Sequence, residues 1–193
     1  MLIDRLVCYG KQTRRINPEN RDFYFISLSM KKILIISDTH NYLDDAIISY
    51  AQKVDEIWHS GDIGSLGVLE QLQKITMVHA VYGNIDGQDL RIRIPKIATF
   101  ECDGLRVLMT HIGGYPGRYD TSVKQEILAY KPNIFISGHS HILKVMNDAK
   151  LNLLHINPGA IGKTGFHQKR TMIELVIDDG VPKNLSVIEY NRW

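Results

Sequence analysis

The chain has 193 residues and a formal net charge of +2, with 44% hydrophobic and 23% charged residues. This composition fits one globular domain and excludes an intrinsically disordered chain. The two cysteines, Cys8 and Cys102, form no CxxC motif, which excludes a disulfide framework and a cysteine-based zinc module. We therefore expect a cytoplasmic protein. The apolar stretches are too short to cross a bilayer, so we expect no membrane partner.

The excess of basic residues lies in residues 1–30, and residues 31–193 are neutral overall. A neutral body lacks the basic stripe of a nucleic-acid-binding protein, so the sequence carries no strong nucleic-acid signal. Met30 lies immediately before the first compact apolar run. We therefore predict that residues 1–30 are an N-terminal extension foreign to the native fold. Residues 31–193 are predicted to form the functional domain.

The first half of this domain alternates between apolar runs and helical patterns. The apolar run 32–37 predicts a buried strand, and a helix is predicted over 43–53. A second strand over 55–60, a second helix over 66–74 and a third strand over 76–82 follow. This alternation predicts parallel strands joined by helical crossovers.

The second half is richer in strands. Asp103-Gly104 between the runs 97–102 and 105–110 predicts a hairpin, and a helix capped by Asp120 or Ser122 is predicted over 121–130. Further strands are predicted at 133–137, 144–148, 151–156, 171–177 and 185–190. The whole pattern predicts an α/β fold in which two sheets pack face to face with helices outside.

Potential metal ligands follow five of the apolar runs, often beside glycine. The carboxyl ends of strands are where open α/β sheets place ligands. Any one of these short motifs occurs by chance, but their common position at strand ends predicts a metal site. The seven candidate ligands are Asp38, His40, Asp62, Asn84, His111, His139 and His141.

The spacing of these residues predicts how they meet. Side chains two apart in an extended segment share a face, so Asp38 and His40 can converge on one ion, and so can His139 and His141. Imidazoles and carboxylates suit zinc, manganese, iron, nickel or cobalt. Seven ligands exceed one tetrahedral site, so we predict two ions with Asp62 as the bridging carboxylate.

Charge then predicts the substrate class. Two divalent cations, two aspartates and one hydroxide would leave a net positive charge, which favours an anionic substrate such as a phosphate ester. Asn84 would coordinate through its carbonyl oxygen without cancelling that charge.

The order D-x-H, GD, GN-x-D, H, GH-x-H resembles the calcineurin-like metallophosphoesterase superfamily, and within it the small single-domain YfcE-type phosphodiesterases. The resemblance implies a four-layer α/β/β/α sandwich of two mixed sheets with flanking helices. It also implies a phosphodiesterase with a binuclear metal centre and a metal-bridging hydroxide. The implied ligands are Asp38, His40, Asp62 and His141 for one metal, and Asp62, Asn84, His111 and His139 for the other.

From this resemblance we take Asp62, Asn84 and His111 as the catalytic residues. We expect two divalent cations, with Mn²⁺ favoured over Zn²⁺, Fe²⁺, Ni²⁺, Co²⁺ or Mg²⁺, and a small phosphate-ester substrate. A homo-oligomer is compatible with the sequence. The alternative is a non-catalytic protein-binding scaffold of the same fold, like Vps29. We favour the enzyme because all seven ligand positions carry ligating side chains.

Ile85 departs from the pattern of many members, which carry a histidine acid there. The YfcE-type proteins also lack that histidine. An isoleucine cannot transfer a proton, so a substrate with a basic leaving group would need another acid, for which His59 and a metal-bound water are the candidates. The role of Asp86 is open. Other histidines are expected to have structural roles: His79 and His155 at the edge of the core, and His167 in a loop.

Overall fold

The computed structural model of this protein describes residues 7–9, 12–16, 23–27 and 30–193, in two compact units, 1–30 and 31–193. In the first unit an antiparallel sheet has the order β1-β2-β3 and comprises β1 (Val7–Tyr9), β2 (Gln12–Ile16) and β3 (Phe23–Ser27). The sequence analysis predicts no strand here, although residues 23–26 of β3 are an apolar run. That residues 1–30 are foreign to the native fold stays a prediction.

The second unit contains two five-stranded mixed sheets. The first has the order β15-β14-β4-β5-β6, in which β4, β5 and β6 are parallel and β14 and β15 are antiparallel to their neighbours. Its strands are β4 (Lys31–Ile36), β5 (Glu56–His59), β6 (Met77–Ala80), β14 (Lys169–Asp178) and β15 (Val181–Asn191).

The second sheet has the order β12-β13-β11-β8-β7, in which β8, β11 and β13 are parallel. Its strands are β7 (Ile97–Cys102), β8 (Leu105–Thr110), β11 (Ile134–Ile136), β12 (Leu143–Asp148) and β13 (Leu153–Pro158). The predicted hairpin and its boundaries are confirmed. A short pair, β9 (Gly114–Tyr115) and β10 (Arg118–Tyr119), was not predicted.

The helices are α1 (Asp45–Ala51), α2 (Leu66–Gln73), α3 (Gln88–Arg91) and α4 (Thr121–Tyr130). α4 has the predicted bounds, and the Asp120 side chain caps it by accepting from the Ser122 N–H. α1 begins later than predicted because Asp44 caps it by accepting from the Ile47 N–H. α3 was not predicted. In the described part of the chain, no helix has the length and apolarity that crossing a membrane needs.

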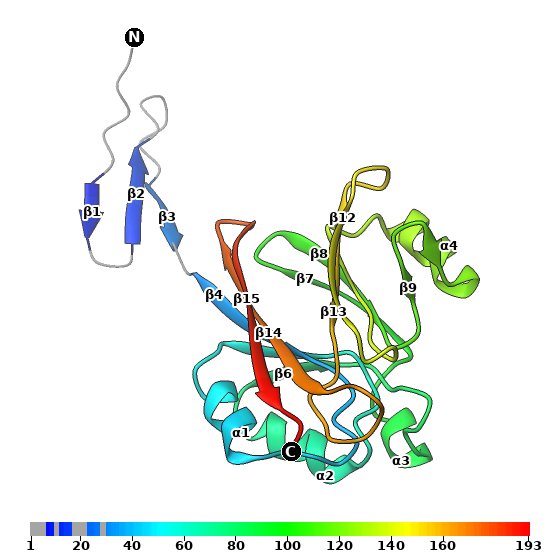
Figure 1. Cartoon of the computed structure of the whole chain (residues 1–193). Coiled ribbons are helices and arrows are strands. Elements are labelled where there is room, and N and C mark those ends of the chain that lie inside the picture. Colours follow the sequence, from blue (N-terminus) through cyan, green and yellow to red (C-terminus); the bar gives the residue numbers. More distant parts are fainter. Residues whose placement is uncertain (1–6, 10–11, 17–22, 28–29) are drawn as a thin grey trace. The chain divides into compact units, whose positions relative to one another are not determined.

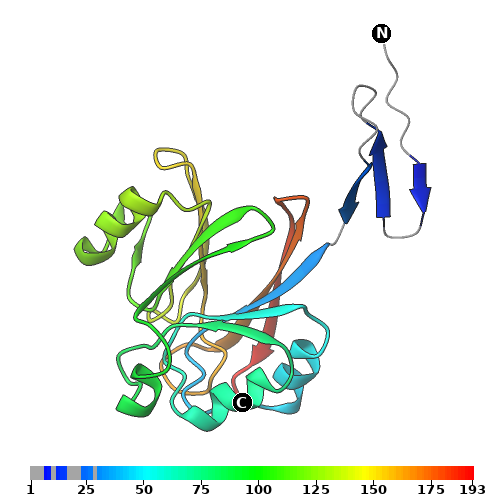
Figure 2. The ribbon, with the colours of Figure 1, turned by 180° about the vertical axis from the view of Figure 1, so that it is seen from behind.

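Alternating side chains of the central strands hold the layers together. Ile33 and Ile35 of β4 join the core between the two sheets, whereas Leu34 and Ile36 pack towards α1 and α2. Leu108 of β8 packs in a third core with Val123 and Ile127 of α4, together with Phe135 and Leu153. The predicted four-layer α/β/β/α arrangement is therefore confirmed, and Figures 1 and 2 show α1 and α2 on one side and α4 on the other.

Candidate metal centre

All the predicted ligands lie in the segments that follow five parallel strands. Asp38 and His40 follow β4, Asp62 follows β5, and Asn84 follows β6, all in the first sheet. The other three ligands follow strands of the second sheet: His111 follows β8, and His139 and His141 follow β11. The structure brings the seven residues to one place, where the carboxyl ends of both sheets meet.

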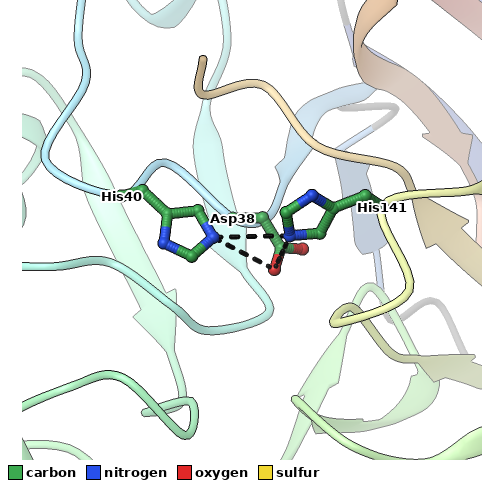
Figure 3. Close-up of side chains that lie close together, drawn as sticks. All are labelled: Asp38, His40 and His141. Atoms are coloured by element: carbon green, nitrogen blue, oxygen red, sulfur yellow. Dashed lines mark hydrogen bonds and ion pairs between the residues drawn. The ribbon is translucent and has the colours of Figure 1, made fainter. Parts of the chain in front are cut away.

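The first cluster consists of Asp38, His40 and His141, whose candidate ligand atoms all lie within 4.8 Å of one another. His141 Nε2 lies 3.1 Å from Asp38 Oδ1 and 3.4 Å from His40 Nε2. Figure 3 shows the three side chains pointing towards one another from segments far apart in the sequence. This is an arrangement that could hold one cation.

The second cluster consists of Asp62, His111 and His139, again with ligand atoms within 4.8 Å of one another. Asn84 belongs beside it, because its Oδ1 lies 3.1 Å from His111 Nε2. Asp62 and His111 are buried, whereas His139 is exposed. Asn84 is exposed as well, so the cluster is open to solvent at His139 and Asn84.

Asp62 lies between the two clusters. Its Oδ1 is 3.3 Å from His111 Nε2 in the second cluster, and its Oδ2 is 3.8 Å from His40 Nε2 in the first. Burial alone would raise the pKa of this carboxyl, but the His111 imidazole and the Ile85 N–H lower it on balance. The side chain is thus ionised at neutral pH and presents one oxygen to each cluster.

We predicted that an extended backbone lets ligands two residues apart converge on one ion, and this prediction is wrong. Asp38, His40, His139 and His141 have φ values of 54°, 47°, 68° and 57°, so they lie in left-handed turns and not in extended segments. Asp62 shares this conformation, with φ of 53°. His139 and His141 also enter different clusters, contrary to the convergence that their spacing predicts. Non-glycine residues seldom adopt this conformation, and such strain collects at functional sites.

The hydrogen-bonding pattern of the described residues fits a cation. Asp38 Oδ1 is buried without a hydrogen bond, although it lies within 3.9 Å of Nε2 of His40, His111 and His141. His111 Nδ1 lies 2.8 Å from the Ser60 carbonyl oxygen, so Nδ1 carries a proton, and in the neutral form of the ring, which is the form that binds a cation, the lone pair lies at Nε2. Nitrogen and oxygen lone pairs then face one another, which is the donor set of a first-row divalent cation.

Electrostatics point the same way. Burial alone would lower the pKa of His111, but the Asp62 and Asp38 carboxylates raise it on balance. The two buried aspartates therefore create a negative potential that favours added positive charge at this point.

Asp86, whose role the sequence leaves open, holds two of the loops in place. Its buried carboxylate accepts hydrogen bonds from the Gly64 N–H and the Gly83 N–H, each at 2.7 Å. Gly83 must be glycine, because a Cβ atom there would overlap the Asp62 carboxylate. Asp86 thus ties the loop of Asp62 to the loop of Asn84. In the sequence, the position of Asp86 between glycines could have indicated a structural role. The groups that donate hydrogen bonds to it are seen only in the fold.

His59 is not available as an acid. It is fully buried, its Nε2 lies 3.0 Å from Thr39 Oγ1, and its Nδ1 accepts from the Gly61 N–H. Burial lowers its pKa to about 4. His79 is half-buried and stacks on Phe100, and His155 is buried, so their predicted structural roles fit the structure.

His167 lies closer to the site than the sequence suggests. It is in a loop, as expected, but its Nδ1 is 3.3 Å from Nδ1 of His141. The two histidines are 26 positions apart in the sequence, so no local spacing could have indicated the contact.

Comparisons with known proteins agree with this geometry. The family model of the calcineurin-like phosphoesterase superfamily domain matches residues 30–180. A probable metallophosphoesterase of Methanothermobacter thermautotrophicus is 31% identical over 134 residues, which cover 65% of this chain and 74% of the relative. A second, from Methanocaldococcus jannaschii, is 29% identical and covers 86% of each chain.

Solved structures share the fold. Vacuolar protein sorting 29 of Cryptosporidium parvum superposes with a TM-score of 0.61 at 18% identity, covering 84% of this chain and 98% of the other. A predicted phosphoesterase of Streptococcus pneumoniae has a TM-score of 0.60 at 21% identity, covering 86% and 91%. An archaeal phosphodiesterase has a TM-score of 0.58 at 24% identity, covering 82% and 99%.

Proposed function

Because the chain belongs to the calcineurin-like phosphoesterase superfamily, we propose that it is a metal-dependent phosphodiesterase with a binuclear metal centre. The observation that carries the proposal is the pair of clusters on either side of Asp62, which faces both. We assign one metal to Asp38, His40, Asp62 and His141, and the other to Asp62, Asn84, His111 and His139. Mn²⁺ is the metal we favour.

When bound, divalent cations lower the pKa of water towards neutrality and stabilise charge on a phosphoryl group. The chain's own residues prepare the site for this. Asp38 and Asp62 supply the negative charge that retains the cations, and the Ser60 carbonyl keeps His111 in the tautomer that presents Nε2. Asn84 adds an oxygen without adding charge, so an anionic substrate is still attracted.

The assignment as a diesterase is supported by the solved archaeal phosphodiesterase that shares the fold. Ile85, which is 47% exposed, offers no proton to a leaving group beside Asn84, so we expect substrates whose leaving group departs without an acid. A small phosphate diester in the cytoplasm is therefore the proposed substrate class.

The test is a metal and activity screen. The purified chain is treated with a chelator and titrated with Mn²⁺, Zn²⁺, Ni²⁺, Co²⁺ or Mg²⁺. Bound metal is counted, and hydrolysis of bis(p-nitrophenyl) phosphate is compared with that of p-nitrophenyl phosphate. We expect about two ions per chain and a higher kcat/KM for the diester. A preference for the monoester would refute the phosphodiesterase assignment.

The second candidate is a protein-binding scaffold, because several solved structures that share this fold are Vps29 proteins. Metal content alone does not separate the candidates, since one of those structures is a Vps29 in complex with zinc. Turnover does: a chain that binds metal but hydrolyses no ester under any added metal would favour the scaffold.

A further inference from the structure

A hydrogen-bonded chain supports the first cluster from outside the predicted ligands. Nδ1 of His141 lies 3.3 Å from Nδ1 of His167, and Nε2 of His167 lies 3.0 Å from the carbonyl oxygen of Gly162. Neither His167 nor Gly162 is among the seven predicted ligands. The hydrogen bonds therefore connect Gly162 to His167 and His167 to His141, which belongs to the cluster.

The chemistry of the three groups fixes where the protons lie. A carbonyl oxygen only accepts, so Nε2 of His167 carries a hydrogen and donates it to Gly162. Neutral His167 therefore has its lone pair at Nδ1 and accepts from Nδ1–H of His141. The Nε2 atom of His141 is then left with a lone pair, which faces Asp38 Oδ1 at 3.1 Å. This is the tautomer that a metal ligand at Nε2 requires.

A backbone hydrogen bond connects Gly162 to the loop that carries Asp38. The Gly162 N–H donates to the Asp38 backbone carbonyl at 3.0 Å, so the residue that accepts from His167 is itself attached to the Asp38 loop. The hydrogen bonds run from the Asp38 backbone through Gly162 and His167 to His141, whose Nε2 lies 3.1 Å from the Asp38 carboxylate with the two lone pairs facing each other. These bonds therefore set the position of His141 relative to Asp38, although the two residues are 103 positions apart in the sequence.

The loop that carries His167 is held for this contact. Arg192 donates to the carbonyl oxygens of Lys163 at 2.9 Å and His167 at 3.1 Å, which pins both ends of the loop. Gly165 lies between them with φ of +119°, and a Cβ atom there would overlap the imidazole of His141. Only glycine lets the loop approach His141 this closely.

We propose that His167 is a positioning residue that holds His141 in its Nδ1–H tautomer and aims Nε2 at the metal site. The inference rests on the proposed metal centre for its functional meaning. Its structural content, the tautomer of His141 in the metal-free chain, is independent of turnover.

The first experiment measures that tautomer. The metal-free full-length chain is labelled with ¹⁵N at histidine, and two-bond ¹H–¹⁵N spectra at neutral pH distinguish a protonated Nδ1 from a protonated Nε2. We expect the Nδ1–H form for His141 and the Nε2–H form for His167. In His167→Ala we expect His141 to become a mixture of both tautomers. An Nε2–H form of His141 in the parent would overturn the proposal.

The second experiment measures metal affinity, with Mn²⁺ titrated into the metal-free chain and followed by calorimetry. Loss of a group that orients a ligand histidine typically weakens metal binding by about 10–100-fold. We expect that loss in His167→Ala at one of two sites, and substantial recovery in His167→Gln, whose amide can donate to Gly162 and accept from His141. Phe166→Ala is the control, because the neighbouring Phe166 side chain is fully exposed.

Equal Mn²⁺ affinity in the parent and in His167→Ala would overturn the positioning role. A parent that binds no metal would refute the proposed metal centre instead, and the tautomer of His141 would still decide whether His141 donates to His167. If His167→Ala does not fold, the tautomer of His141 in the parent still tests the proposal.

Discussion

Replacing Asp86 tests whether the loops of the site are held by a buried carboxylate. Asp86 is 3% exposed, and its two oxygens each accept one backbone N–H, from Gly64 and from Gly83, at 2.7 Å. These are hydrogen bonds to an ionised group, each contributing about 1.5–3 kcal/mol. Asp86→Ala removes both and should cost about 3–6 kcal/mol, a large part of the stability of a typical domain.

Asp86→Asn is the more informative change, because it keeps the size of the side chain and one acceptor oxygen. One of the two N–H groups then faces an amide NH₂ and loses its partner, which should cost about 1.5–3 kcal/mol. Asp62 and Asn84 lie in the loops that Asp86 ties together, so kcat/KM should also fall. A displacement of about 1 Å at a reacting centre can cost about 100-fold.

Urea unfolding of the metal-free chain measures the first effect, read as a lower midpoint at an unchanged slope. Asp89→Asn is the matched control, since Asp89 is exposed and carries the same change of charge. If Asp86→Asn and Asp89→Asn both unfold within about 0.5 kcal/mol of the parent, the carboxylate does not hold the loops and the reasoning is wrong.

Four further predictions concern metals, chemistry, pH and the N-terminal segment. Asp62→Ala should lower the occupancy of both metals and His141→Ala mainly that of one, counted by metal analysis; a parent that never exceeds one ion contradicts the bridge. A leaving-group acid typically contributes about 10²–10⁴-fold, so kcat/KM should fall steeply from aryl to alkyl diesters, and Ile85→His should flatten the trend. A flat trend in the parent, with chemistry rate-limiting, would reveal an acid elsewhere. Burial lowers the pKa of His155 from 6.5 to about 4, so the unfolded chain binds a proton first as pH falls. Stability should drop by about 3 kcal/mol between these values, and less in His155→Gln, measured by urea unfolding across pH. A chain that begins at Met30 should fold and keep its activity, and failure to fold would show that residues 1–30 are integral.

The elements that could be predicted were those with a strong local signal. The apolar run of β4 marks a strand buried on both faces, and the Asp103-Gly104 turn marks the hairpin. α4 has both an apolar stripe and a capping aspartate, and its bounds agree with the prediction. In the second unit, the elements that were missed are short: α3 spans four residues, and β9 and β10 span two each. Such segments are too short for a period to be read.

The residues of the metal centre could be named from the sequence because each follows a strand directly, and this local pattern survives without the fold. Their grouping could not. Spacing in an extended segment places His139 with His141, but left-handed turns send them to different clusters. Left-handed turns also bring Asp38 and His40 together. Their proximity therefore does not come from the two-residue period of a strand.

By itself, the sequence determined the order of the longer strands and helices of the second unit, the four-layer fold, and the seven side chains gathered where parallel strands end. These depend on periodicity and on neighbouring residues. The tertiary structure alone decided which side chains meet across long stretches of chain, such as Asp86 with Gly64 and His141 with His167. The physical reason is that a hydrogen bond acts over about 3 Å in space, whereas a local pattern carries information only over a few residues of sequence.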